Sequence, residues 1–163
     1  MTVRLEVDPD PSDELRNAIL GPLKEFNSFN GYPPDAKPVA IVLRDEVRGI
    51  IGGLWGRTGY AWLFIEFLIV DDALRGRNFG ARLMRAAEEL AVERECVGAW
   101  LTTFPFQARG FYEKLGYSVF AELENSPGDN VRLFMRKRLG TGLWSCQSGV
   151  PDAANWRAHH LRG

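Results

Sequence analysis

The alternation of hydrophobic and polar positions changes along the chain and predicts a mixture of strands and helices. Residues 3–7, "VRLEV", alternate as a strand does. Residues 8–30 follow with Pro, Ser and Asp residues that start helices, and then with apolar side chains at helical spacing. We therefore expect a first strand and then one or two helices, with a break near Gly21 and Pro22.

Three strands are expected after this helical segment and a turn-rich loop. The segments 39–45 and 47–59 flank a tight turn near Asp45 and are expected to form an antiparallel hairpin. Residues 60–70, "YAWLFIEFLIV", are apolar nearly throughout, which is typical of a central strand covered on both faces. Glu66 is the one charged residue inside that run.

From residue 77 onward the periodicity becomes helical and then returns to strands. The helix carries an apolar stripe that should dock against the sheet, formed by Phe79, Leu83, Ala86, Ala87 and Leu90. A further strand is expected over 97–104, and a short helix should end at Gly116 in a left-handed C-cap. Two closing strands, 117–123 and 131–139, complete the pattern.

Length and composition limit the classes of protein that fit. The chain of 163 residues suits one domain, expected over residues 1–139, with a C-terminal segment, 140–163, of unknown role. A formal net charge of -1 predicts no overall basic field for nucleic acid or an anionic membrane. Cys96 and Cys146 lack partners at metal-ligand spacing, so no metal is expected. The absence of a signal peptide or long apolar stretch favours a cytoplasmic protein outside the membrane.

The stretch 67–90 joins an apolar strand to a helix through a polar turn. A helix start leaves backbone N–H groups without partners, and the helix dipole favours an anion there. Gly76 and Gly80 remove side chains that would block an approaching phosphate, and Arg75 and Arg77 add positive charge. The turn therefore predicts a pyrophosphate cradle. The alternative is that the glycines serve only the turn and helix packing, with the arginines solvated.

The details of this turn favour one class of cofactor. Neither the dinucleotide pattern GxGxxG nor the P-loop pattern occurs in the chain. The turn "RGRNFG" instead resembles the acyl-CoA pyrophosphate motif of the GNAT superfamily of N-acetyltransferases, at Arg75, Gly76, Arg77, Asn78, Phe79 and Gly80. The family usually has glycine where this chain has Asn78. Asn is the non-glycine residue that best tolerates a left-handed backbone, so the turn is expected to form.

A second stretch carries the same resemblance. Residues 100–120, "WLTTFPFQARGFYEKLGYSVF", look like the family's fifth strand and the helix that follows it. The resemblance covers roughly residues 3–139. It implies an α/β (α+β) fold with a mixed, mostly antiparallel central sheet of about seven strands, flanked by helices, whose fourth and fifth strands splay apart.

The resemblance also implies an activity. The expected reaction moves an acetyl group from acetyl-CoA to a primary amine of a small molecule or peptide, by direct attack in a ternary complex. In this family backbone groups of the fourth strand hold the thioester, so Leu68, Ile69 and Val70 are expected to contact acetyl and pantetheine. Gln107 falls where relatives often have a cofactor-contacting Asn. The alternative, motivated by Asn78, is a non-catalytic acyl-CoA-binding or regulatory module of the same fold.

Tyr112 is the candidate general acid, because it occupies the position of the second motif where many family members place one. A phenol with a reference pKa of about 10 is protonated at neutral pH and can donate to a departing thiolate. The alternative is that Tyr112 packs beside Phe111 and Leu115, with its hydroxyl bonded locally.

Glu66 is the candidate base, acting directly or through water. A carboxylate inside an apolar strand is costly unless it is used or paired. Period-two alternation places it on the same face as Leu68 and Val70. The alternative is a structural ion pair on a covered sheet face.

The tail and the loop before the first hairpin leave the acceptor open. Trp144 and Trp156 in the segment 140–163, and the loop 30–37, motivate a peptide or protein acceptor as an alternative to a small molecule. The tail could also cover the interface of a homodimer. No basic pattern interleaves the tryptophans, so a nucleic-acid stacking platform is not expected.

Overall fold

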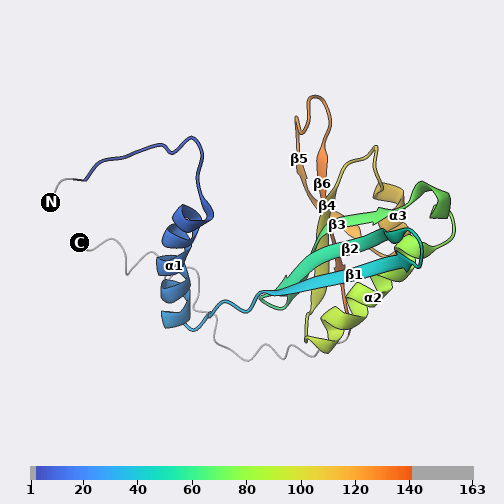
Figure 1. The fold of residues 1–163 in the computed structure, drawn as a ribbon, viewed down its shortest axis with the longest axis horizontal. Coiled ribbons are helices and arrows are strands. Elements are labelled where there is room, and N and C mark those ends of the chain that lie inside the picture. Colours follow the sequence, from blue (N-terminus) through green and yellow to red (C-terminus); the bar gives the residue numbers. More distant parts are fainter. Residues whose placement is uncertain (1–2, 141–163) are drawn as a thin grey trace.

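The computed structural model describes residues 3–140 and centres on a six-stranded sheet (Figure 1). The strand order is β1-β2-β3-β4-β6-β5, and only the β3–β4 pair is parallel. The strands are β1 (Lys37–Asp45), β2 (Gly49–Gly59), β3 (Trp62–Val70), β4 (Gly98–Thr103), β5 (Ser118–Leu123) and β6 (Arg132–Arg138). The predicted mixed, mostly antiparallel sheet is confirmed, with six strands in place of about seven.

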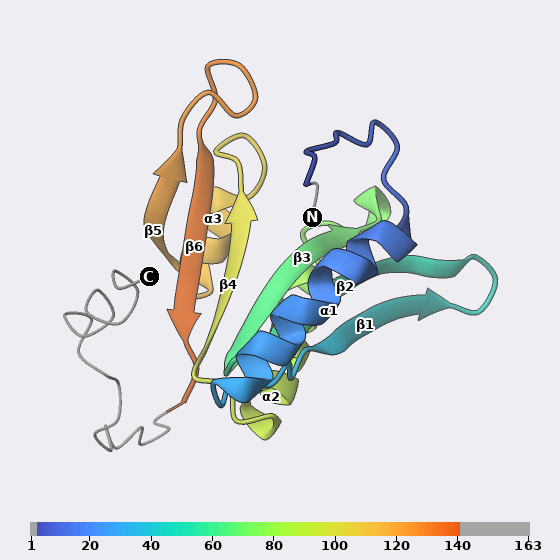
Figure 2. The same ribbon diagram turned by 90° about the vertical axis from the view of Figure 1, so that its left-hand side faces the viewer.

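The helices lie on opposite sides of this sheet. They are α1 (Asp13–Phe29), the short 3-10 helix η1 (Asp72–Leu74), α2 (Phe79–Glu93) and α3 (Arg109–Lys114). In the view from the side of the sheet on which α1 lies, α1 stands in front of the strands and α2 lies behind them (Figure 2). No residue of α1 is buried, whereas α2 buries a stripe close to the predicted one, Leu83, Met84, Ala87 and Ala91.

The hydrophobic core fills the space between α2 and one face of the sheet. Alternate residues of the strands point into it, including Leu63, Leu101 and Met135, each at most 1% exposed. Burying a leucine side chain fully contributes about 1.5–3 kcal/mol, so this layer is the main source of stability. It also fixes the position of α2, whose first turn lies at the end of β3.

Two expectations for the N-terminal region were wrong. Residues 3–7 form no strand, and Val3, Leu5 and Val7 are 77–93% exposed. An alternating segment forms a strand only where a neighbour supplies hydrogen bonds, and these residues lie away from the sheet (Figure 1). The helix is also not broken near Gly21, because α1 continues through Pro22. Proline removes one helical hydrogen bond, and in an exposed helix water can satisfy the freed carbonyl.

The local turns follow their sequence signals. The carboxylate of Asp45 accepts hydrogen bonds from the N–H groups of Val47 and Arg48, at 3.0 and 2.9 Å, and closes the β1–β2 hairpin. Gly116 follows α3 with φ of +89°, in the left-handed conformation expected of a C-cap. Within residues 3–140, none of the helices combines the length and the apolarity needed to span a bilayer.

Candidate active site

β3 and β4 separate at the middle of the sheet. Their parallel pairing ends at Ile65 and Leu101, although β3 continues to Val70 and β4 to Thr103. Beyond this point the edges of the two strands that face each other are free. The splayed strands expected from the sequence are therefore present, as β3 and β4.

A β-bulge in β3 lies where the two strands part. Trp55 of β2 pairs with Phe67, but the next residue, Gly56, pairs with Ile65. Glu66 is thus the extra residue, opposite no partner on β2. A bulge of this kind bends the strand and increases its local twist, which carries the end of β3 away from β4.

The bulge also changes which face each side chain of β3 occupies. Ile65 before it, and Leu68 and Val70 after it, all pack on the core. Glu66 instead forms an ion pair with Arg57 of β2. The expectation that Glu66 shares a face with Leu68 and Val70 was wrong, because an inserted residue breaks the period of two.

A cleft of about 1010 Å³ opens between the splayed strands. Its walls are residues 66–70 of β3, residues 74–76 and 78–81 of the turn and first turn of α2, and a third group from β4 to α3. The third group is Thr102, Thr103, Phe106, Gln107, Ala108, Phe111 and Tyr112. Every site residue that the sequence predicts lines this cleft except Arg77.

The turn before α2 has the backbone that an anion site requires. Gly76 and Asn78 have φ of +74° and +64°, both left-handed, and the expectation that Asn78 would tolerate this conformation is confirmed. The side chain of Asn78 makes no capping hydrogen bond, and the first turn of α2 contains no acidic residue. The N–H groups of that turn and the positive end of the helix dipole are therefore unopposed by a side chain.

The arginines of the turn are already engaged. Arg75 forms an ion pair with Asp72 at 2.6 Å. The guanidinium of Arg77 lies over the ring of Phe79, 5.8 Å from its centroid. The backbone at the start of α2, more than these side chains, is thus what the structure offers to an anion.

Gly80 lies where α2 approaches α3. A Cβ atom at this position would be 3.2 Å from Cζ of Phe111, which also lines the cleft. The sequence left two roles open for Gly80, keeping the phosphate site clear and allowing close helix packing. Both apply here, because a larger side chain would push Phe111 of α3 and so displace the cleft wall.

Tyr112 is buried in the cleft wall, with 8% of its surface exposed. Its ring makes edge contacts with Phe111 and Tyr117, at centroid distances of 5.0 and 6.0 Å. Burial raises the pKa of Tyr112, which keeps the phenol protonated. Among the described residues its hydroxyl has no hydrogen-bond partner, whereas the hydroxyl of neighbouring Tyr117 donates to Glu88 at 3.0 Å.

Gln107 holds the loop at the end of β4. Its side-chain oxygen accepts hydrogen bonds from the backbone N–H of Phe104 and the hydroxyl of Thr103, at 3.3 and 3.4 Å. The amide therefore shapes the rim of the cleft, whatever it contacts in a complex.

Several cleft residues were missed in reading the sequence. Phe67, Thr102 and Phe106 line the cleft, and Phe106 stacks on Phe104 with ring centroids 5.2 Å apart. For Thr102 and Phe106 the available signal was the run "TTFPF", which crosses the end of β4, because large aromatic side chains in a loop are often binding-site walls.

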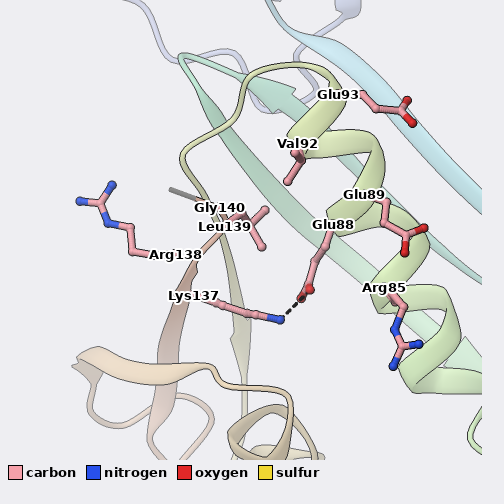
Figure 3. A pocket seen from close by; sticks show the side chains of 9 residues that line it. All are labelled: Arg85, Glu88, Glu89, Val92, Glu93, Lys137, Arg138, Leu139 and Gly140. Atoms are coloured by element: carbon pink, nitrogen blue, oxygen red, sulfur yellow. Dashed lines mark hydrogen bonds and ion pairs between the residues drawn. The ribbon is translucent and has the colours of Figure 1, made fainter. Parts of the chain in front are cut away.

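A second hollow lies between α2 and the end of β6 (Figure 3). There the ammonium of Lys137 pairs with Glu88 at 2.6 Å, and Arg138 points away to the other side of the strand. Of the six charged residues that line it, only Lys137 and Glu88 form an ion pair within residues 3–140, and the hollow contains no helix N-terminus of the kind found in the first cleft. Among residues 3–140, no three His, Cys, Asp or Glu side chains gather as a metal site would require.

Comparisons with known proteins agree with this geometry. The model of the acetyltransferase (GNAT) family matches residues 6–117. Acetyltransferase Atu2258 of Agrobacterium fabrum is 33% identical over 126 residues, which cover 77% of this chain and 92% of that protein. Blasticidin-S acetyltransferase of Streptomyces morookaense is 39% identical over 122 residues, covering 74% and 85% of the two chains.

Solved structures share the fold. A crystal structure of an Agrobacterium tumefaciens protein assigned to the acetyltransferases superposes with a TM-score of 0.77 and 28% identity, covering 83% of this chain and 99% of that one. An aminoglycoside 6'-N-acetyltransferase solved with coenzyme A has the same fold, with a TM-score of 0.56 and 20% identity, over 71% and 76% of the two chains. With its splayed strands, its bulge and its left-handed turn into α2, this chain belongs to the GNAT family of acetyltransferases.

Proposed function

We propose that the protein transfers an acetyl group from acetyl-CoA to a primary amine of a small molecule, by direct attack in a ternary complex. The observation that carries the proposal is the single cleft that joins an unopposed helix N-terminus to the hydroxyl-bearing ring of Tyr112. The first suits a pyrophosphate, and the second suits a leaving thiolate.

Each part of the cleft has a proposed role. The first turn of α2, with Gly76, Asn78 and Gly80, would hold the pyrophosphate through backbone N–H groups. The free edge of β3 at residues 68–70 would hydrogen-bond the pantetheine and the thioester carbonyl, and Gln107 would contact the cofactor at the opposite rim.

The proposed reaction needs no external reductant or oxidant. The amine, once it has lost a proton, bonds to the acetyl carbonyl carbon, and the carbon–sulfur bond breaks. Tyr112 would supply the proton that the thiolate takes up. Glu66 would receive the proton of the amine, directly or through water, with Arg57 as the counter-ion of its carboxylate.

The names of the relatives support a small-molecule acceptor. One relative is a blasticidin-S acetyltransferase, and one protein of the same fold is an aminoglycoside acetyltransferase. Both names denote acetylation of a low-molecular-weight compound. We therefore place small amines before peptides as acceptors for this chain.

The test is a calorimetric titration with acetyl-CoA, followed by a thiol-release assay over a panel of amines. Binding together with amine-dependent release of CoA is the expected result. Binding without release for any small amine or peptide amine would favour a non-catalytic acyl-CoA-binding module. Absence of binding would overturn the assignment of the cleft to the cofactor.

A further inference from the structure

The helix α1 carries an apolar stripe that no other part of residues 3–140 covers. Leu15, Ile19, Leu23 and Phe26 recur at the spacing of one helix face, and they are 37–70% exposed. An amphipathic helix gains most of its stability by packing that face against another surface. The stripe therefore indicates a missing contact.

The sheet presents a matching surface on the side away from α2. On β1, β2 and β3, two cross-strand rows of side chains lie next to each other there, Ala40–Trp55–Phe67 and Val42–Gly53–Ile69. The four large side chains of these rows are 44–66% exposed: Val42, Trp55, Phe67 and Ile69. We refer to these four residues as the open-face patch. A contiguous apolar patch of this kind usually marks an interaction site.

The two surfaces do not meet within one chain. The linker from α1 to β1 is fixed at the far end of β2, where the carboxylate of Asp35 accepts from the N–H of Tyr60 at 2.9 Å. The hydroxyl of Tyr60 also donates to the carbonyl of Tyr32 at 3.2 Å. Beyond this anchor α1 stands clear of the strands, as an arm (Figures 1 and 2).

The charges of the arm complement those of the open face. Residues 3–29 contain six acidic and three basic residues, a net charge of -3. Arg136 and Arg138 occupy positions of β6 that alternate with the buried Leu133 and Met135, so they lie on the open side. Neither arginine forms an ion pair with another residue of the range 3–140.

We propose that the protein is a homodimer in which residues 3–29 of each chain pack against the open-face patch of the other. The exchange is symmetric, since the same arm and the same patch are used twice, and it closes after two copies. It buries the α1 stripe and the patch together and brings the acidic arm to the arginine-bearing face.

The exchange has a consequence for the cleft. Phe67 and Ile69 belong both to the open-face patch and to the cleft wall. The arm of the partner would therefore lie along the rim through which an acceptor enters. Each active site would then be built from two chains. The dimer would form through α1 and the open-face patch whatever reaction the cleft catalyses.

The experiment is sedimentation velocity of the full chain over a concentration series, with two charge-introducing variants. Phe26→Glu alters the stripe and Trp55→Glu alters the patch. Asn17→Glu introduces the same charge on the opposite side of α1 and is the matched control. Circular dichroism of each variant verifies that it is folded.

Wild type and Asn17→Glu should sediment as dimers. Each of the other two variants should dissociate at least about tenfold more readily, as expected for a central interface residue. An equimolar mixture of Phe26→Glu and Trp55→Glu should recover dimers, because one of its two arm–patch contacts is wild type on both sides.

Other results would overturn the exchange. A monomeric wild type would show that the stripe and the patch do not join two copies. A dimer unaffected by both variants would place the interface elsewhere. Two folded, monomeric variants that fail to pair when mixed would indicate that the arm acts within its own chain.

Discussion

The two faces of the sheet are built from the same strands and differ in what covers them. On the α2 side, Leu63, Leu101 and Met135 are at most 1% exposed. On the open side, Phe67 and Ile69 of the same β3 strand are 66% and 62% exposed. The covered face stabilises the fold and positions the start of α2. The open face contributes little to the stability of the folded monomer and is available for recognition. The cleft is lined by residues from both faces.

The largest expected difference between the faces is in stability. Leu101→Ala should lower the free energy of unfolding by about 2–5 kcal/mol, because it leaves a cavity in the covered layer. Val42→Ala, on the open face, should lower the free energy of unfolding of the monomer by less than about 1 kcal/mol. Urea unfolding at low protein concentration measures both. Equal losses would mean that the open face is also part of the monomer's core.

The next effect concerns the two tyrosines on the covered side. Tyr112→Phe should lower kcat about 100-fold, the lower range for loss of a general acid, with the affinity for acetyl-CoA nearly unchanged. Tyr117→Phe is the control, since it is equally buried but its hydroxyl is bonded to Glu88 outside the cleft. Steady-state kinetics and calorimetry separate the two effects. An unchanged kcat in Tyr112→Phe would remove it as the acid.

A smaller effect is expected at the start of α2. Gly80→Val should raise the Kd for acetyl-CoA about tenfold, because its side chain meets Phe111 and displaces the cleft wall. Gly110→Val is the matched control, as a Cβ there meets nothing within 4 Å. Calorimetric titration of both variants gives the comparison. Retained affinity in a folded Gly80→Val protein would show that the cofactor does not lie against this turn.

The smallest expected effect is the dependence of stability on alkaline pH. Burial, and then the negative charge of Glu88, raise the pKa of Tyr117 above its usual range. The protonated phenol therefore stabilises the fold fully below pH of about 10, where unfolded tyrosine titrates, and this contribution is lost as the pH rises further. Wild type should lose stability more steeply above pH 10 than Tyr117→Phe, as measured by urea unfolding. Parallel curves would contradict the raised pKa.

Local signals in the sequence predicted most of the covered face and of the cleft. The α2 stripe, the hairpins and the left-handed turn at Asn78 depend on nearby residues, and they formed as expected. The bulge at Glu66 could not be predicted, because it depends on how β2 pairs with β3, with Gly56 as the partner residue that matters. In Gly56 a Cβ would collide with the carbonyl oxygen of Phe64, a constraint visible only in three dimensions.

The N-terminal region shows the limit of pattern reading most clearly. Residues 3–7 alternate like a strand and α1 is amphipathic like a packed helix, yet neither meets its own sheet. Periodicity states which side chains should be buried, but not which surface buries them. Residues 141–163 of the predicted tail lie outside the described residues, so the expectations for the tail stay predictions.

The bulge at Glu66 also determines which residues of β3 face the core. The inserted residue shifts the alternation of β3 by one position. Odd-numbered residues face the core before it, and even-numbered residues face the core after it. Residues 67–70, "FLIV", supply hydrophobic groups to both sides at once. The unbroken apolar run, which is typical of a strand covered on both faces, here belongs to a strand with one covered face, because Phe67 and Ile69 are part of the exposed open-face patch.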